Sequence, residues 1–319
     1  MENQERIPVF FTIDDKYAPI LDVAIRSLIL NASRNRKYVI YIIYDGLTEE
    51  NRKILERLGD STFDIRPVQM ALSAGSISDR RENHLRCDYF TLTIFFRLFI
   101  AEMFPQYDKG IYLDSDIVVP GDISKLYDME LGDNLIGACT DRSVSDVLEL
   151  VTWIEKGVGV KSDRYVNSGI LLMNLKKLRL VHFSAHFMKL LNTFHFESIA
   201  PDQDYINAIC EDRILFLGEE WDVMPNVRKP EYPSPQIIHY NLFDKPWHYD
   251  DVQYSDYFWR YAQSSDYYSA ICAIKEGYSE DMKERDRACM GKMLERAVKA
   301  PDDGVTFAKA GKDIVKIKM

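Results

Sequence analysis

The sequence predicts an α/β fold in which helices flank a mostly parallel central sheet and a helical appendage follows at the C-terminal end. Its 319 residues, 46% of them hydrophobic, are enough for one full-sized core. Apolar runs alternate with amphipathic segments over roughly the first 70 residues, which indicates strands joined by right-handed crossovers. Near residue 256 the composition shifts toward helix-forming stretches. We therefore expect a main domain at 1–255 and an appendage at 256–319.

Three strands are predicted in the first part of the chain. They are IPVFFTID at 7–14, YVIYIIYD at 38–45 and FDIRPVQM at 63–70. Their β-branched and aromatic residues favour strands, and their nearly continuous apolar character is typical of strands buried on both faces.

Two helices are predicted between these strands. ILDVAIRSLILNAS at 20–33 places its apolar residues on one helical face, and LTEENRKILERL at 47–58 follows as the second helix. Thr48 is the predicted N-cap of the second helix, with Asn51 in the place of the usual capping-box glutamate.

The middle of the chain predicts two further helices and three further strands. YFTLTIFFRLFIAEMF at 89–104 has the length of a helix despite its β-branched and aromatic content. GIYLDSDIVV at 110–119 is predicted to be one central strand, and NLIGACTD at 134–141 and GILLMNL at 169–175 are two more. DQDYINAIC at 202–210 predicts a helix with its isoleucines on the inner face.

The appendage is predicted to be helical at 256–275 and 280–300, and the residues from Pro301 onward are expected to be loosely held. Four apolar residues share one face of the second stretch, and basic residues occupy much of the rest: Met290, Met293, Leu294 and Ala297. This pattern is typical of an amphipathic helix packed on the main domain. The alternative is a peripheral contact with an anionic membrane.

Composition excludes some function classes and compartments. The formal net charge of −10 argues against a nucleic-acid partner. Five cysteines without CxxC or metal-site spacing fit a reducing compartment: Cys87, Cys139, Cys210, Cys272 and Cys289. The start of the chain has no signal-peptide pattern, and the longest apolar stretch, 89–104, is interrupted by Arg97. We therefore expect a cytoplasmic protein.

Two carboxylates, Asp114 and Asp116, interrupt the apolar run at 107–119. On an extended backbone they project to the same side, where their oxygens suit a hard divalent cation such as Mg²⁺ or Mn²⁺. A D-x-D pattern alone is weak, because the chain contains a second one at 202–204. There Asp202 also fits a helix N-cap and Asp204 the first helical turn, so metal binding is favoured only at the first pair.

A candidate third ligand lies in QIIHYNLFDKPW at 236–247. His239 follows an apolar, strand-like trio, and Lys245 comes six residues later. This mixture suits a loop closing over a diphosphate, with His239 on a metal and Lys245 on a phosphate oxygen. The alternative is that His239 has only a structural role.

Five stretches, in order, resemble glycosyltransferase family 8. They are TIDDKYAPILDVAIRSL, FFRLFIAEMFPQYDKGIYLDSDIVV, YVNSGILLMNLKKLR, PDQDYINAI and IIHYNLFDKPWH. The resemblance covers about residues 7 to 250, so the main domain would be catalytic. It implies a GT-A fold, a UDP-glucose or UDP-galactose donor, Mn²⁺ or alternatively Mg²⁺ as cofactor, and retention of the anomeric configuration.

The resemblance also assigns site residues. It implies that the metal ligands are Asp114, Asp116 and His239, and that the donor is bound by Asp14, Tyr17, Arg97, Asp114, Ser115, Asp141, Asn167, Ser168 and Lys245. Asp14 and Tyr17 would hold uracil and ribose, and Asp141, Asn167 and Asp202 would hold the hydroxyls of the hexose. The alternatives are turn chemistry at strand ends and, for Arg97, a structural ion pair with a nearby aspartate.

Gln203 and Asp202 are the catalytic residues that the resemblance implies, with Gln203 nearest the anomeric carbon. A carboxamide is a poor nucleophile, so we expect front-side attack rather than a covalent intermediate. Gln203 would stabilise the developing positive charge through its carbonyl dipole. Two departures from the family pattern, Lys16 and Leu242, leave the metal ligands intact but alter the surroundings of the nucleotide and the phosphate.

The expected function is therefore transfer of a hexose from a UDP-sugar to a glycan or glycolipid acceptor, in the cytoplasm or at the inner membrane face. Three alternatives stay open. A nucleotidyltransferase is disfavoured because TIDDKYAPI lacks a glycine-rich phosphate loop. A glycogenin-like protein that glycosylates its own tyrosine and a sugar-nucleotide-binding protein without turnover are the other two. The sequence determines neither the acceptor nor the oligomeric state.

Overall fold

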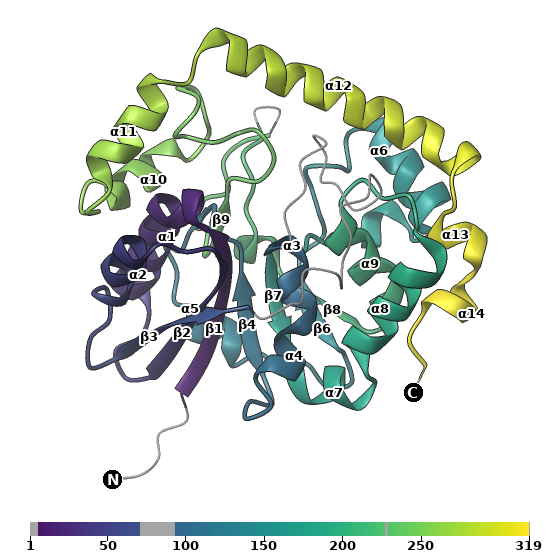
Figure 1. Ribbon diagram of the computed structural model, residues 1–319, viewed down its shortest axis with the longest axis horizontal. Coiled ribbons are helices and arrows are strands. Elements are labelled where there is room, and N and C mark those ends of the chain that lie inside the picture. Colours follow the sequence, from purple (N-terminus) through teal and green to yellow (C-terminus); the bar gives the residue numbers. More distant parts are fainter. Residues whose placement is uncertain (1–5, 71–92, 227–228, 319) are drawn as a thin grey trace.

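A computed structural model gives the fold and describes residues 6–70, 93–226 and 229–318. Its centre is a seven-stranded sheet in the order β3-β2-β1-β4-β7-β6-β8 (Figure 1). The strands are β1 Arg6–Asp14, β2 Lys37–Asp45, β3 Phe63–Gln69, β4 Gly110–Leu113, β6 Ile136–Ala138, β7 Ile170–Met173 and β8 Ile214–Phe216. Of these seven described strands, only β7 runs antiparallel to its neighbours, β4 and β6. The prediction of a mostly parallel sheet is confirmed.

A second, two-stranded sheet pairs β5 Ile117–Val118 with β9 Ile238–His239 in antiparallel register. Helices cover both faces of the main sheet. The α-helices are α1 Ala18–Asn31, α2 Glu49–Glu56, α3 Thr93–Phe96, α4 Ile100–Met103, α5 Ile123–Tyr127, α6 Leu148–Thr152, α7 Leu175–Leu180, α8 Phe183–Phe194, α9 Pro201–Cys210, α10 Ser255–Ala262, α11 Tyr268–Glu276, α12 Glu280–Asp303, α13 Phe307–Ala310 and α14 Lys312–Val315. The 3₁₀ turns are η1 Asp15–Tyr17, η3 Arg97–Phe99, η5 Ser162–Arg164 and η6 Glu219–Trp221, and η4 Trp153–Val158 is a π-helix.

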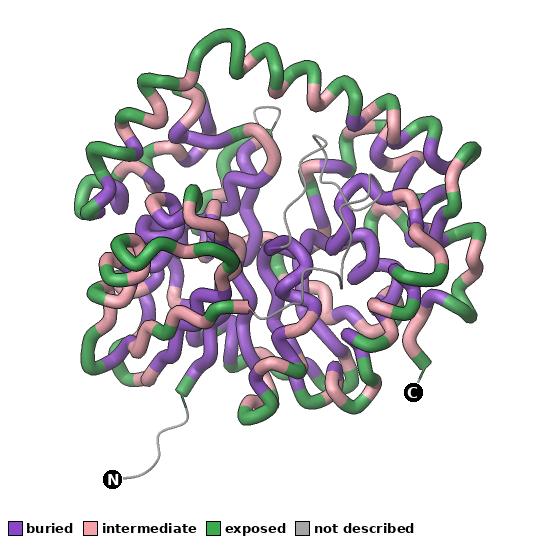
Figure 2. Tube along the Cα trace, viewed as in Figure 1, coloured by how far each residue is buried: buried purple, intermediate pink, exposed green. Residues whose placement is uncertain are grey.

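The two faces of the sheet bury separate hydrophobic cores, because successive side chains of a strand point to opposite sides. In β1, Val9 and Phe11 join the core beneath α1 and α10, whereas Phe10 joins the core beneath α4 and α8. Figure 2 shows the strands as a buried centre with exposed residues around it. Burial on both faces explains why β1 and β2 are apolar at almost every position.

The first part of the chain folds as predicted. The strands expected at 7–14, 38–45 and 63–70 correspond to β1, β2 and β3, and they pair in parallel. The two helices between them are α1 and α2. The Thr48 side chain caps α2 by accepting a hydrogen bond from the Asn51 backbone N–H.

Two predictions for the middle of the chain are wrong in detail. The helix expected at 89–104 is interrupted, because residues 97–99 form a 3₁₀ turn between α3 and α4. The first four residues of this expected helix, 89–92, lie outside the described part of the chain, as does Cys87. Within this stretch the Arg97 side chain donates a hydrogen bond to the Ile94 carbonyl and so competes with the helical ladder. The strand expected at 110–119 is two strands, β4 and β5, which belong to different sheets.

The predicted helix at 202–210 is α9, but its N-cap is Ala200 and not Asp202, which lies in the first turn. Every residue of α9 is buried, so the helix has no solvent-facing side. The C-terminal residues are not loosely held either. Helix α12 continues through Pro301, and Phe307 of α13 and Val315 of α14 are buried.

The apolar face of α12 packs against the body of the protein. Met293 and Ala297 are buried there, and Met290 and Leu294 contact the same core. The packed helix is therefore the interpretation that these contacts support. Among the residues that the structure describes, no helix combines the length and apolar character needed to cross a bilayer.

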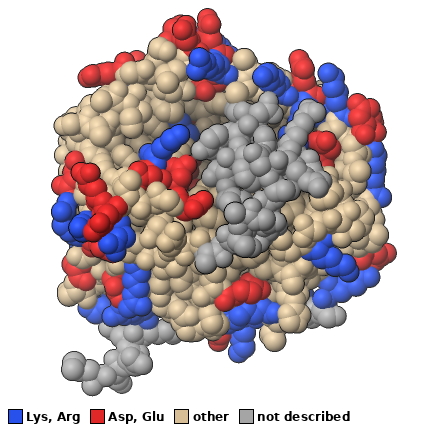
Figure 3. Space-filling view, in the orientation of Figure 1, with Lys and Arg blue, Asp and Glu red and all other residues tan. Residues whose placement is uncertain are grey.

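Charges of both signs are interspersed over the face shown in Figure 3. The four described cysteines are free thiols, and Cys139 and Cys210 among them are buried. The division of the chain into a main domain at 1–255 and an appendage at 256–319 stays a prediction.

Candidate functional site

One cavity of about 350 Å³ collects nearly all of the predicted site residues. It opens at the edge of the main sheet where β1 and β4 end, which is where open α/β sheets bind ligands. The predicted residues that line it are Asp14, Tyr17, Arg97, Asp114, Ser115, Asp116, Asn167, Ser168, Asp202, Gln203, His239 and Lys245. Asp141 does not line the cavity.

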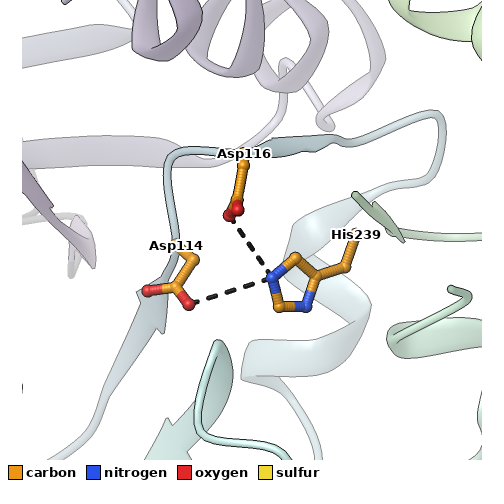
Figure 4. A group of neighbouring side chains, drawn as sticks. All are labelled: Asp114, Asp116 and His239. Carbon is orange, nitrogen blue, oxygen red and sulfur yellow. Dashed lines mark ion pairs between the residues drawn. The ribbon is translucent and has the colours of Figure 1, made fainter. Parts of the chain in front are cut away.

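Asp114, Asp116 and His239 converge in this cavity (Figure 4). One ligand atom from each lies within 4.8 Å of the others. His239 Nε2 is 3.3 Å from Asp116 Oδ1 and 3.8 Å from Asp114 Oδ2. The three side chains come from the end of β4, the start of β5 and β9, so the group forms only where the two sheets meet.

Backbone hydrogen bonds hold these residues in register. The Asp114 N–H donates to the Gly169 carbonyl at 2.7 Å, and the Tyr240 N–H donates to the Asp116 carbonyl at 2.9 Å. Pairing of Ile117 with His239 links β5 to β9. The break in the predicted strand at 114–116 therefore lets the two carboxylates turn toward the histidine.

The arrangement fits a divalent cation. Two carboxylates and one imidazole form an oxygen-rich donor set with one nitrogen, which suits Mn²⁺. The space between the ligands depends on Gly169, since a Cβ there would lie 2.4 Å from His239 Cε1 and 2.7 Å from Asp114 Oδ2. A glycine at this position keeps open the space between Asp114, Asp116 and His239, which is called the cradle below.

Cationic side chains of the protein neutralise part of the negative charge of Asp114 and Asp116. The Lys245 ammonium donates to a carboxylate oxygen of Asp116 and to the Tyr240 carbonyl. Burial alone would raise the pKa of Asp116, but Lys245 and His239 hold it well below its ordinary value. Burial disfavours a charged imidazole, yet Asp116 and Asp222 raise the pKa of His239 to about 10. A metal and a proton thus compete for His239.

Asp222 is a residue that the sequence reasoning missed. Its Oδ1 lies 3.1 Å from His239 Nδ1, and its side chain has no exposed surface. Burial raises the pKa of Asp222 to about 6. Asp222 lies 17 positions before His239 and belongs to no recognisable pattern, so no sequence signal pointed to it.

Arg97 links the metal-site carboxylates to the region expected to hold the sugar. Its guanidinium lies 2.8 Å from Asp114 Oδ1 and 3.2 Å from Asp202 Oδ2, and it donates to the Ser168 carbonyl at 2.7 Å. It also lies over the Tyr112 ring, 4.4 Å from the centroid. Burial opposes the charge, but the two carboxylates raise the pKa of Arg97, so it stays cationic. The structural ion pair is thus present, and the donor contact stays a prediction.

Gln203 is held at both ends of its amide. Its Nε2 donates to Asp141 Oδ2 at 2.8 Å, and its Oε1 accepts from the Ser168 backbone N–H at 3.1 Å. Asn167 Nδ2 also donates to Asp141 Oδ2, at 3.2 Å. Asp141 therefore lies behind the cavity wall and orients the two amides that line it.

The remaining predicted residues occupy the rim and the wall of the cavity. Asp14 caps η1 by accepting from the Tyr17 backbone N–H at 3.2 Å, which is the turn chemistry given as the alternative. Ser115 donates to the Thr12 carbonyl. Ser168 Oγ donates to Asp202 Oδ2 at 2.8 Å.

Asp204, in the second D-x-D, has a structural role. It accepts hydrogen bonds from the Ser198 hydroxyl, the Ile199 and Ala200 backbone N–H groups and the Tyr165 hydroxyl. All of these partners are buried with it. The second D-x-D therefore directs one carboxylate, Asp202, to the cavity and the other into the protein interior.

Comparisons with known proteins identify the family of this chain. The family model described as glycosyl transferase family 8 matches residues 8–251. A relative from Haemophilus influenzae is 26% identical over 220 residues, and the chain spans 64% of its length. The lipopolysaccharide 1,2-glucosyltransferase of Escherichia coli is 27% identical over 277 residues, which are 80% of this chain and 78% of that protein.

Among solved structures, the galactosyltransferase LgtC in complex with donor and acceptor sugar analogs matches with a TM-score of 0.69 at 24% identity. The match covers 88% of this chain and 100% of that one. This likeness shows the GT-A fold, with its mostly parallel sheet flanked by helices. Because the family model covers most of this chain, the chain belongs to glycosyltransferase family 8.

Proposed function

We propose that this chain is a metal-dependent retaining hexosyltransferase that moves glucose or galactose from a UDP-sugar to a glycan or glycolipid acceptor. The observation that carries the proposal is the convergence of Asp114, Asp116, His239 and Lys245 in one cavity at the end of β4. Membership of family 8 supports the reaction class. The lipopolysaccharide glucosyltransferase among the relatives supports a role in cell-surface polysaccharide synthesis.

Asp114, Asp116 and His239 would hold the divalent cation, and the imidazole ligand favours Mn²⁺ over Mg²⁺. Such a cation, when bound, stabilises the negative charge that develops on a departing diphosphate. Lys245 would bind a phosphate oxygen as a point charge, which requires its ammonium to leave Asp116. Asp14, Tyr17 and Ser115, at the rim near the end of β1, would hold the uridine.

The wall opposite these residues would bind the hexose. Asp202 and Asn167 would hydrogen-bond its hydroxyls, and Arg97 would keep Asp202 oriented. Gln203 offers a carbonyl dipole in a fixed orientation, which stabilises positive charge at the anomeric carbon without forming a bond to it. The acceptor oxygen would attack on the face that the diphosphate leaves. The bond from C1 to the phosphate oxygen breaks, a bond from C1 to the acceptor oxygen forms, and the acceptor proton passes to the released phosphate.

The test is release of UDP from a panel of UDP-sugars, with Mn²⁺ or with EDTA, by the wild-type chain and by Asp116→Asn. We expect metal-dependent turnover of one donor by the wild type and its loss in the variant, with an unchanged circular dichroism spectrum. Stabilisation by UDP and Mn²⁺ without turnover, with or without acceptor, would indicate a binding protein. A mass increase of the intact protein by one hexose would indicate self-glycosylation.

We further propose that the enzyme works in the cytoplasm at the inner membrane face, where a lipid-linked acceptor would be available. The free thiols of the described cysteines support a reducing compartment. Since the apolar face of α12 packs on the protein, a membrane contact through this helix would use only exposed basic side chains such as Lys292 and Lys299. Pelleting with anionic but not with neutral vesicles, sensitive to salt, is the expected result.

A further inference from the structure

We infer that Asp222 is a positioning residue for the metal-binding His239, an inference that rests on the metal-dependent function proposed above. The two side chains are hydrogen-bonded, with Asp222 Oδ1 3.1 Å from His239 Nδ1. Both side chains are buried: that of His239 is 3% exposed and that of Asp222 is 0% exposed. Asp222 is behind His239, on the side away from Asp114 and Asp116, and it does not line the cavity.

The backbone locks the two residues in register. Val223 forms a parallel bridge with Ile238. The Val223 N–H donates to the Ile237 carbonyl at 3.0 Å, and the His239 N–H donates to the Val223 carbonyl at 2.8 Å. The backbone next to Asp222 therefore cannot move relative to His239 without breaking these two main-chain hydrogen bonds of Val223.

This contact decides which nitrogen of His239 faces the cavity as a ligand. With a metal bound, the imidazole would be neutral, with one N–H and one lone pair, and a carboxylate beside Nδ1 would hold the proton on that nitrogen. The lone pair is then on Nε2, the atom that lies 3.3 Å from Asp116 Oδ1 and 3.8 Å from Asp114 Oδ2. The carboxylate also fixes the orientation of the ring and raises its strength as a ligand.

The chain offers a matched control for this residue. Asp22 in α1 is also fully buried, and like Asp222 it has one carboxylate oxygen without a hydrogen-bond partner among the described residues. Its other oxygen accepts from Arg26 at 2.6 Å, and it does not line the cavity. Asp22→Asn therefore neutralises a comparable buried carboxylate without touching His239.

The experiment measures Mn²⁺ affinity in the presence of UDP, by electron paramagnetic resonance of free Mn²⁺, for wild type, Asp222→Asn, Asp222→Ala and Asp22→Asn. Loss of an outer partner of a metal-binding histidine typically weakens metal affinity 10- to 100-fold. We expect this loss in both Asp222 variants and an unchanged affinity in Asp22→Asn. The nitrogen coupling of bound Mn²⁺, absent in His239→Ala, is expected to weaken in the Asp222 variants.

A second measurement uses the wild-type protein, so its result does not depend on whether the Asp222 variants fold. In ¹⁵N-histidine-labelled protein with Mg²⁺ and UDP, the signals missing from His239→Ala should show a protonated Nδ1 and a non-protonated Nε2. The opposite tautomer, or Asp222 variants that bind Mn²⁺ within twofold of wild type, would overturn the inference while leaving the proposed function standing. A wild type that binds no Mn²⁺ with UDP would overturn both.

Discussion

Replacing Gly169 by alanine would put a methyl group between two of the metal ligands. An ideal Cβ there lies 2.4 Å from His239 Cε1 and 2.7 Å from Asp114 Oδ2, whereas ordinary contacts of a Cβ begin at 3.4 Å. The glycine cannot easily withdraw, because its carbonyl accepts from the Asp114 N–H and its N–H donates to Asn167 Oδ1. His239 must therefore retreat by about 1 Å, well beyond the roughly 0.2 Å over which metal–ligand distances vary.

A misplacement of about 1 Å costs on the order of 100-fold in rate, which is about 2.7 kcal/mol of transition-state stabilisation. We therefore expect Gly169→Ala to lower kcat/KM for the UDP-sugar about 100-fold and to weaken Mn²⁺ binding. Kinetics with a titration of Mn²⁺ would separate the two effects, since a loss confined to metal affinity is recovered at high Mn²⁺.

The matched control is Gly291→Ala in α12, where a Cβ would meet nothing within 4 Å. That change is expected to leave activity alone and to stabilise the helix by about 1 kcal/mol. A Gly169→Ala variant with wild-type Mn²⁺ affinity and kcat/KM within about threefold would refute the geometry proposed for the cradle.

Three further predictions concern other parts of the chain. Lys245→Met should tighten the binding of Mn²⁺ alone, because Lys245 occupies Asp116, and weaken UDP binding with Mn²⁺ about tenfold or more; calorimetry measures both. His248 stacks on Tyr278, and burial, aided by Lys245, lowers its pKa to about 4. Its contribution to stability is complete above pH 6.5 and lost as the pH falls toward 4, so the melting temperature of His248→Phe should decline less over that range. Phe307→Ala should cost about 3–5 kcal/mol in chemical unfolding, since Phe307 is 1% exposed.

Each of these has a result that would contradict it. Weaker binding of Mn²⁺ alone to Lys245→Met would mean that the lysine assists the metal instead of competing with it. Parallel pH profiles for wild type and His248→Phe would remove His248 as the cause of acid destabilisation. A loss no larger for Phe307→Ala than for Ile314→Ala, at a half-exposed position, would restore the expectation of a loosely held C-terminal end.

Much of the fold could be predicted because its determinants are local. Strands β1 and β2 are nearly continuous apolar runs, and α1 and α2 show helical periodicity and, in α2, a capping threonine. Short-range patterns of this kind depend on neighbouring residues alone. The direction of β7 and the separation of β5 from β4 depend on which distant strand each one meets, so the sequence pattern did not reveal them.

The sequence by itself determined the strand–helix alternation, the family and the identity of Asp114, Asp116 and His239 as the candidate ligands. The tertiary structure decided how these residues are supported. It placed Asp222 behind His239, joined Arg97 to two carboxylates and set Asp141 behind Gln203. A buried charge needs a partner in space, and that partner can come from any part of the chain. Such pairings therefore cannot be predicted from the spacing of residues along the sequence.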